Sequence, residues 1–171
     1  QEYSYNAQSY TVSSDPPLYM IGNSIRNHLS KASKVYVLCA TIGEAVEDRI
    51  STLFKDGQYT LGLLLDAAAT TAVEQVANQL NEVIDGVAKK DGYTNTWRFS
   101  PGYGDWPVDA QKVFSNIIKT EEINVHVTET SMLFPRKSVT AIIGAMQQGV
   151  STTPKGCASC TQKNCSYRRN R

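Results

Sequence analysis

The sequence has no apolar run long enough to cross a bilayer and no marked excess of one charge. Its longest candidate, YTLGLLLDAAATTAV, is interrupted by Asp66 and threonines, whereas a transmembrane helix needs roughly 20 mainly apolar residues. Seventeen Lys and Arg against sixteen Asp and Glu give a net charge of +1, which offers no electrostatic case for nucleic acid or an anionic membrane. The polar start lacks a signal-peptide pattern. These features predict a cytoplasmic protein without nucleic-acid or membrane partners.

Familiar catalytic motifs are also missing. The sequence has no Walker loop and no GxGxxG after a strand. Its two histidines, His28 and His126, lie far apart, and His126 falls on the polar side of a predicted strand, where a solvated side chain is the favoured interpretation. Glu121 and Glu122 lead into that strand, where two adjacent side chains face opposite ways. No hydrolase constellation is visible.

The length of 171 residues fits one domain with an appended segment. We predict a poorly specified lead-in over residues 1–20, an α+β domain over 21–148, and a linker with a cysteine-rich tail over 149–171. Apolar and alternating patterns predict strands at 34–41, 94–100, 123–130 and 138–144. Helical spacings predict helices that begin near Ser24, Val46, residue 59 and Asp109. Because these elements do not repeat as βαβ units, we expect a mainly antiparallel sheet with helices packed on it.

The longest predicted helix, over 59–88, has one apolar stripe and one acid placed away from it. The stripe has helical spacing and comprises Ala69, Ala72, Val76, Leu80, Val83 and Val87. Glu74 lies two residues from Val76, roughly 160–200° around the helix. On the sequence alone, a solvated glutamate is the favoured interpretation of Glu74.

The segment RFSPGYGDWP, residues 98–107, is too broken for a helix. Its backbone is set by a proline and two glycines, which fix φ or allow close approach, at Pro101, Gly102 and Gly104. Arg98 can bind a carboxylate or phosphate through a bidentate fork, and Tyr103 and Trp106 can stack on a flat ring or face a cation. Residue chemistry therefore leaves two interpretations open: a binding loop for a small molecule, or a rigid turn packed by its own aromatic side chains.

This loop resembles the RPAPGYP signature of the reactivation domain of cobalamin-dependent methionine synthase, and more closely the stand-alone activation-domain-like proteins. The resemblance covers most of the chain from about 35 to 145 and includes VYVLCATIG, AAATTAVEQVANQL and TETSMLFPRKSVTAIIG, followed by the terminal CASCTQKNCSYR. It implies an α+β fold with a twisted antiparallel sheet that binds S-adenosylmethionine. By match to the signature, Arg98, Ser100, Gly102 and Tyr103 take ligand-binding positions, with Gly104 in the same backbone segment. Glu74 falls where the family's long helix carries a glutamate beside the ligand.

The resemblance also implies partners. The family restores an inactive cobalamin by adding one electron, from a flavodoxin- or ferredoxin-like donor, and the methyl group of S-adenosylmethionine. The chain has no DxHxxG motif for cobalamin, so the corrinoid would be carried by a methionine synthase or a related corrinoid protein. The alternative is a non-catalytic docking module for a corrinoid or iron–sulfur partner that keeps the fold and has lost ligand binding.

Three of the four cysteines lie in the last fifteen residues, and the fourth, Cys39, falls in an apolar run typical of a buried thiol. Cys157, Cys160 and Cys165 form a CxxCxxxxC pattern that can ligate zinc or an iron–sulfur cluster. A flexible tail with free thiols or an adventitious disulfide is the alternative.

Overall fold

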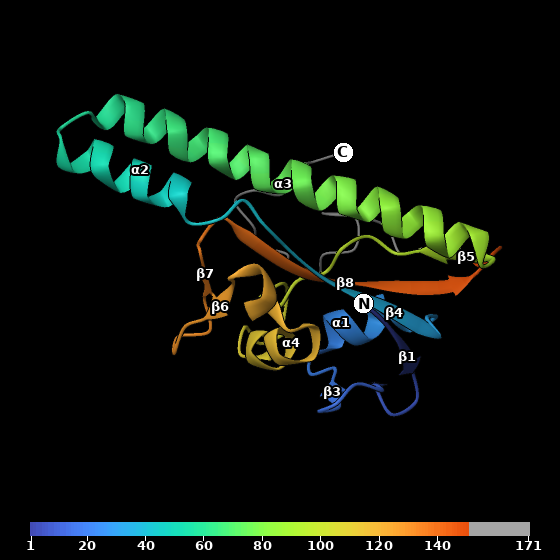
Figure 1. Ribbon diagram of the computed structural model, residues 1–171. Helices are drawn as coiled ribbons and strands as arrows, with labels where there is room; N and C mark the ends of the chain where they lie inside the picture. Colours follow the sequence, from blue (N-terminus) through green and yellow to red (C-terminus); the bar gives the residue numbers. More distant parts are fainter. Residues whose placement is uncertain (151–171) are drawn as a thin grey trace, which may run out of the picture.

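A six-stranded antiparallel sheet forms the centre of the protein, here a computed structural model that describes residues 1–150 (Figure 1). The strand order is β3-β2-β1-β4-β8-β5. The strands are β1 (Glu2–Asn6), β2 (Thr11–Val12), β3 (Leu18–Tyr19), β4 (Lys34–Thr41), β5 (Tyr93–Asn95) and β8 (Ser138–Gln147). Two short strands, β6 (His126–Val127) and β7 (Leu133–Phe134), pair separately. The predicted α+β fold with an antiparallel sheet is confirmed.

Strands β4 and β8 are the longest strands of the sheet, and both are apolar on both faces. They pair along the whole of β4, from Lys34 opposite Ala145 to Thr41 opposite Ser138. Side chains of the two strands alternate between two buried clusters, one on each face of the sheet. Strand β4 has the predicted bounds, and β8 runs three residues beyond its predicted end.

Helices cover both faces of this sheet. They are α1 (Asn23–His28), α2 (Ala45–Lys55), α3 (Tyr59–Lys90), α4 (Ala110–Ile118) and the 3-10 turn η1 (Thr120–Ile123). Figure 1 shows α3, with α2 folded back against it, along one face, and α1 and α4 on the other. Within the described part of the chain, none of these helices has the length and apolar character needed to cross a membrane.

Helix α3 extends over the predicted residues but buries only part of the predicted stripe, at Ala69 and, partly, at Leu80. The residues that it buries are small and recur at helical spacing, at Gly62, Ala69, Val73, Ala77 and Ala88. Val76, Val83 and Val87 are exposed, contrary to the prediction. The small residues let the helix backbone approach its neighbours closely, so the valines beside them remain outside the contact.

The first 20 residues contain regular structure that the sequence analysis does not predict. Strands β1, β2 and β3 form one half of the sheet, and β1 joins it to the centre by pairing with β4. Tyr5, Val12 and Leu18 are buried in the core cluster on the side of α1 and α4. These strands are short and mostly polar, so their partners across the sheet, and not local pattern, hold them in place.

The predicted strand over 123–130 is wrong at both ends. Residues Thr120–Ile123 form η1, Ile123 is exposed, and only His126–Val127 remain in a strand. The cause is Thr120, whose carbonyl accepts from the Val125 amide at 3.0 Å and whose hydroxyl donates to the Val125 carbonyl at 2.8 Å. This closed turn buries Val125 and leaves His126 exposed, as predicted for that histidine.

The predicted strand over 94–100 also ends early, after Asn95. The Thr96 hydroxyl accepts from the Gly144 amide at 2.9 Å, and His28 Nε2 bonds the Trp97 carbonyl at 2.9 Å. The side chains of Thr96 and His28 thus form hydrogen bonds with backbone groups that would be available to a longer β-ladder. The chain rejoins β8 only at Phe99, through an isolated bridge to Ile142. This departure brings Arg98 within hydrogen-bonding distance of α3.

Candidate functional site

The Pro/Gly loop after Phe99 is closed by its own backbone hydrogen bonds. The Tyr103 amide donates to the Ser100 carbonyl at 3.0 Å, the Gly102 amide to the Trp106 carbonyl at 3.0 Å, and the Trp106 amide to the Tyr103 carbonyl at 3.1 Å. These turns need positive φ at Gly102 (90°) and Gly104 (58°), a region where glycine avoids the steric cost of a side chain. The predicted need for permissive backbone is confirmed at both glycines.

The second half of the loop is anchored to α1. The Asp105 carboxylate accepts from the amides of Asn23 at 2.6 Å and Ser24 at 2.8 Å, the first residues of α1. These hydrogen bonds, led by the one from Ser24, lower the pKa of Asp105. A Cβ on Gly104 would lie 2.6 Å from Ser24 Oγ. The predicted N-cap residue Ser24 therefore lies inside the helix, and Asp105, 81 residues later, caps it.

We expect Asp105→Ala to lower the free energy of unfolding by about 1 kcal/mol, the typical value of a helix N-cap. Urea denaturation at pH 7 measures this change. Asp105→Asn keeps one acceptor oxygen and should lose less. Equal losses in the two variants would contradict the capping role.

Trp106 does not face a ligand. Its side chain is 2% exposed, and its ring meets Phe114 edge-on with centroids 5.5 Å apart and lies 6.1 Å from Phe99. The prediction that Trp106 could stack on a bound ring is wrong because the loop directs this side chain into the core. Tyr103 is the aromatic residue of the loop that remains exposed, at 53%.

Arg98 ties the start of the loop to α3. Its Nη2 donates to Glu74 Oε2 at 3.2 Å and to Asn78 Oδ1 at 2.9 Å. Glu74 and Asn78 are one helical turn apart, so one guanidinium reaches both. The Arg98 side chain is 18% exposed and that of Glu74 is 53% exposed. Two residues that the sequence analysis selects separately are thus in direct contact.

A cavity of about 340 Å³ lies beside this pair, between α3, the loop, the start of α4, the β6–β7 segment and β8. Its polar walls include Glu74, Ser100, Tyr103, Gln111, Arg136 and Thr140. Thr140 donates to Gln111 Oε1 at 2.9 Å, and both residues are buried. The volume is at the small end of the range for ligand pockets, about 300–1,000 Å³.

Three of the six predicted cofactor-binding residues line this cavity and three do not. Glu74, Ser100 and Tyr103 are on its wall. Arg98 stands behind Glu74, and Gly102 and Gly104 shape the loop without lining the cavity. The sequence analysis missed Gln111 and Arg136. The only signal for Arg136 was a basic residue in the segment FPRKS, which leads into β8.

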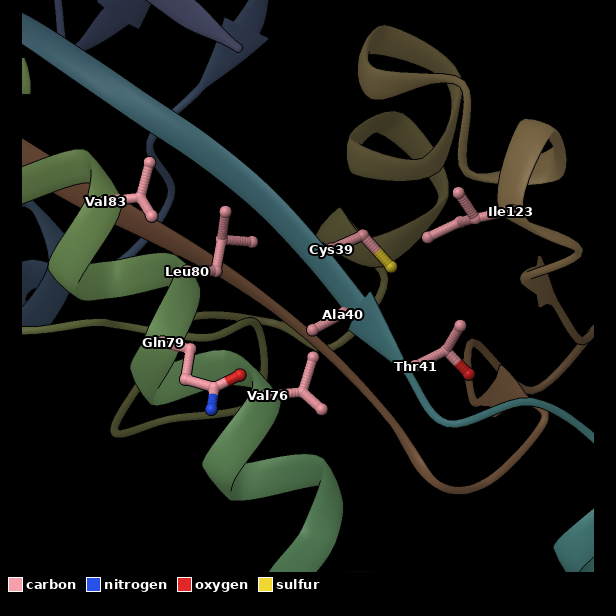
Figure 2. A pocket seen from close by; sticks show the side chains of 8 residues that line it. All are labelled: Cys39, Ala40, Thr41, Val76, Gln79, Leu80, Val83 and Ile123. Carbon is pink, nitrogen blue, oxygen red and sulfur yellow. The ribbon is translucent and has the colours of Figure 1, made fainter.

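A second, open groove of about 410 Å³ lies between α3 and β4. Val76, Leu80 and Val83 point from α3 toward β4, and Ile123 lies on the far side of Cys39 (Figure 2). Cys39 is half-buried, so the prediction of a buried core thiol is only partly confirmed. Burial raises the pKa of Cys39 to about 11, which keeps the thiol protonated at neutral pH and a weak nucleophile. This groove carries little polar chemistry.

The predicted metal ligands Cys157, Cys160 and Cys165 lie outside the described residues. Within residues 1–150, no three His, Cys, Asp or Glu side chains are grouped so that they could hold a metal ion.

Comparison of the chain with protein-family models and with curated proteins finds no match. The cavity beside Glu74 and Tyr103 is therefore interpreted from its own chemistry and from the sequence motif that forms part of its wall.

Proposed function

We propose that the protein binds S-adenosylmethionine in the cavity beside Glu74 and serves the reductive remethylation of a corrinoid on a partner protein. The observation that supports this proposal is the meeting of Glu74, Ser100 and Tyr103 at one cavity. Glu74 lies on α3, 26 residues before Ser100, and the resemblance to methionine synthase reactivation domains singles out all three residues.

The side chains suit the ligand's charges. The half-exposed Glu74 carboxylate on the cavity wall can attract the sulfonium or the amino group of S-adenosylmethionine, and the exposed Tyr103 ring can contact the sulfonium face or the adenine. Arg98 holds Glu74 from behind and is itself held by Asn78, which fixes the carboxylate before the ligand arrives. The chain's contribution is positioning, because methyl transfer from a sulfonium requires in-line geometry and no proton transfer.

In the proposed reaction, the partner's cobalt accepts one electron from a flavodoxin- or ferredoxin-like donor and then attacks the methyl carbon with its electron pair. The cobalt–carbon bond forms, the carbon–sulfur bond breaks, and S-adenosylhomocysteine leaves. The exposed Tyr103 and the open side of the cavity would face the corrinoid.

Calorimetric titration of S-adenosylmethionine into the full chain tests the binding step. We expect saturable binding that weakens about tenfold or more in Glu74→Gln, since losing a charge-assisted contact costs about 1.5–3 kcal/mol. The glutamine still accepts a hydrogen bond from Arg98. Glu82→Gln is the matched control, because Glu82 is exposed on the same helix outside the cavity. Equal affinity in wild type and Glu74→Gln would contradict the site.

The alternative, a docking module without ligand binding, has two observations in its favour. The Arg98 guanidinium is already bound by Glu74 and Asn78, and the apolar groove at Cys39 offers a surface for another protein. Absence of heat on titration of wild type, together with co-purification of a corrinoid protein, would favour this alternative.

A further inference from the structure

The arginine that the sequence selects for an anionic ligand is poorly placed to receive one. Arg98 gives its Nη2 to Glu74 and Asn78, its side chain is 18% exposed, and it does not line the cavity. A ligand carboxylate that took Arg98 Nη2 would compete with Glu74, the acid that the cationic end of the ligand needs. Because Arg98 is paired with Glu74 and does not line the cavity, it is placed to position that acid and not to meet the ligand's carboxylate.

Arg136 has the opposite properties. It lines the cavity, and its side chain is 65% exposed. Its Nε donates to Glu47 Oε2 at 3.4 Å, and no other side chain within residues 1–150 takes its terminal nitrogens. The Glu47 carboxylate is buried and also accepts from the Lys137 amide at 2.8 Å. Glu47 thus binds both the backbone amide of Lys137 and the Nε of Arg136. The terminal nitrogens of Arg136 keep the forked donors that suit a carboxylate.

The charges on the cavity wall form a complementary pair. Of the described residues that line it, Arg136 is the one cation and Glu74 the one acid. They come from different elements, the loop before β8 and helix α3. A wall with one charge of each sign fits a ligand with a zwitterionic amino-acid end better than a simple anion or cation.

We infer that Arg136, and not Arg98, receives the carboxylate of the amino-acid end of the ligand, while Arg98 positions Glu74. The inference rests on the proposed function, since it specifies how the same cavity holds S-adenosylmethionine. It assigns to Arg136 a role in ligand selection: the residue would distinguish ligands with a carboxylate from otherwise identical ligands without one.

A two-ligand titration tests this assignment. S-adenosylmethionine and its decarboxylated form, which keeps the sulfonium and the amine, are each titrated into wild type, Arg136→Gln and Arg98→Gln. We expect wild type to bind the decarboxylated ligand about tenfold or more weakly. In Arg136→Gln the affinity for S-adenosylmethionine should fall to the same level, and the preference for the carboxylate should disappear.

The variants separate the possible failures. Arg98→Gln should weaken both ligands alike and keep the preference, because it acts through Glu74. Arg49→Gln, an exposed arginine on α2 away from the cavity, should change neither affinity. Loss of the preference in Arg98→Gln, with Arg136→Gln unchanged, would overturn the inference and leave the proposed function standing. Absence of binding of S-adenosylmethionine to wild type would remove both.

Discussion

Replacing Trp106 with alanine is expected to lower the free energy of unfolding by about 3–5 kcal/mol, the range for removing a large buried aromatic side chain. The ring is almost fully buried and contacts Phe99 and Phe114. For a chain of this length, 3–5 kcal/mol corresponds to a fall in the melting temperature of roughly 6–20 °C. Urea and thermal denaturation, followed by far-UV circular dichroism, measure the change.

Two further variants in the same loop distinguish the loss of buried aromatic volume from the loss of an exposed ring. Trp106→Phe keeps most of the apolar volume and removes an indole Nε1 that has no hydrogen-bond partner among the described residues, so we expect it to cost less than half as much as alanine. Tyr103→Ala should change stability by less than about 1 kcal/mol, because Tyr103 is half-exposed. A loss in Tyr103→Ala as large as that in Trp106→Ala would contradict this division of the loop.

The loop therefore combines the two interpretations that its composition leaves open. Asp105 and Trp106 attach it to α1 and to the core. Ser100 and Tyr103 remain on the cavity wall. A rigid turn and a binding surface are not exclusive here, because the hydrogen bonds that close the turn also fix which side chains face outward.

Elements with a strong local signal could be predicted from the sequence. Strand β4 has a continuous run of apolar residues, and α3 is long and ends before the left-handed turn at Gly92. The features that could not be predicted depend on residues that are distant in the sequence. Strands β1–β3 depend on β4, the end of β5 depends on His28 and Thr96, and the cap of α1 is supplied by Asp105. No pattern within a short window contains these contacts.

The same distinction applies to the candidate site. Arg98 and Glu74 could be selected from the sequence, but their ion pair could not, because it joins residues 24 positions apart. The only local signal for Arg136 was its charge in the segment FPRKS, and its importance comes from the cavity wall that it shares with Glu74. The exposed valines of α3 show a further limit of prediction from hydrophobic periodicity. When a helix has two adjacent apolar faces, the pattern does not show which face is buried.

Lowering the pH from 7 to 4 is expected to destabilise the fold through His28, by up to about 3 kcal/mol. The side chain is buried against Trp97 and Phe99, and burial lowers the pKa of His28 from 6.5 to about 4. Between these values the unfolded chain binds a proton at this residue and the folded chain does not. The free energy of unfolding then falls by as much as about 1.4 kcal/mol for each tenfold rise in proton concentration. Below pH 4 both states are protonated, and this contribution stops changing.

His28→Gln isolates the effect from that of the carboxylates. Glutamine can still donate to the Trp97 carbonyl and cannot take up a proton, so its unfolding free energy should lose most of the slope between pH 6.5 and 4.5. Asp105, whose pKa is lowered, loses its ionic contribution only at more acidic pH, and this loss is common to both proteins. His126→Gln, at an exposed position, should keep the slope of wild type. Urea denaturation at half-unit pH steps provides the comparison, and parallel curves for wild type and His28→Gln would show that His28 is not buried as a neutral side chain.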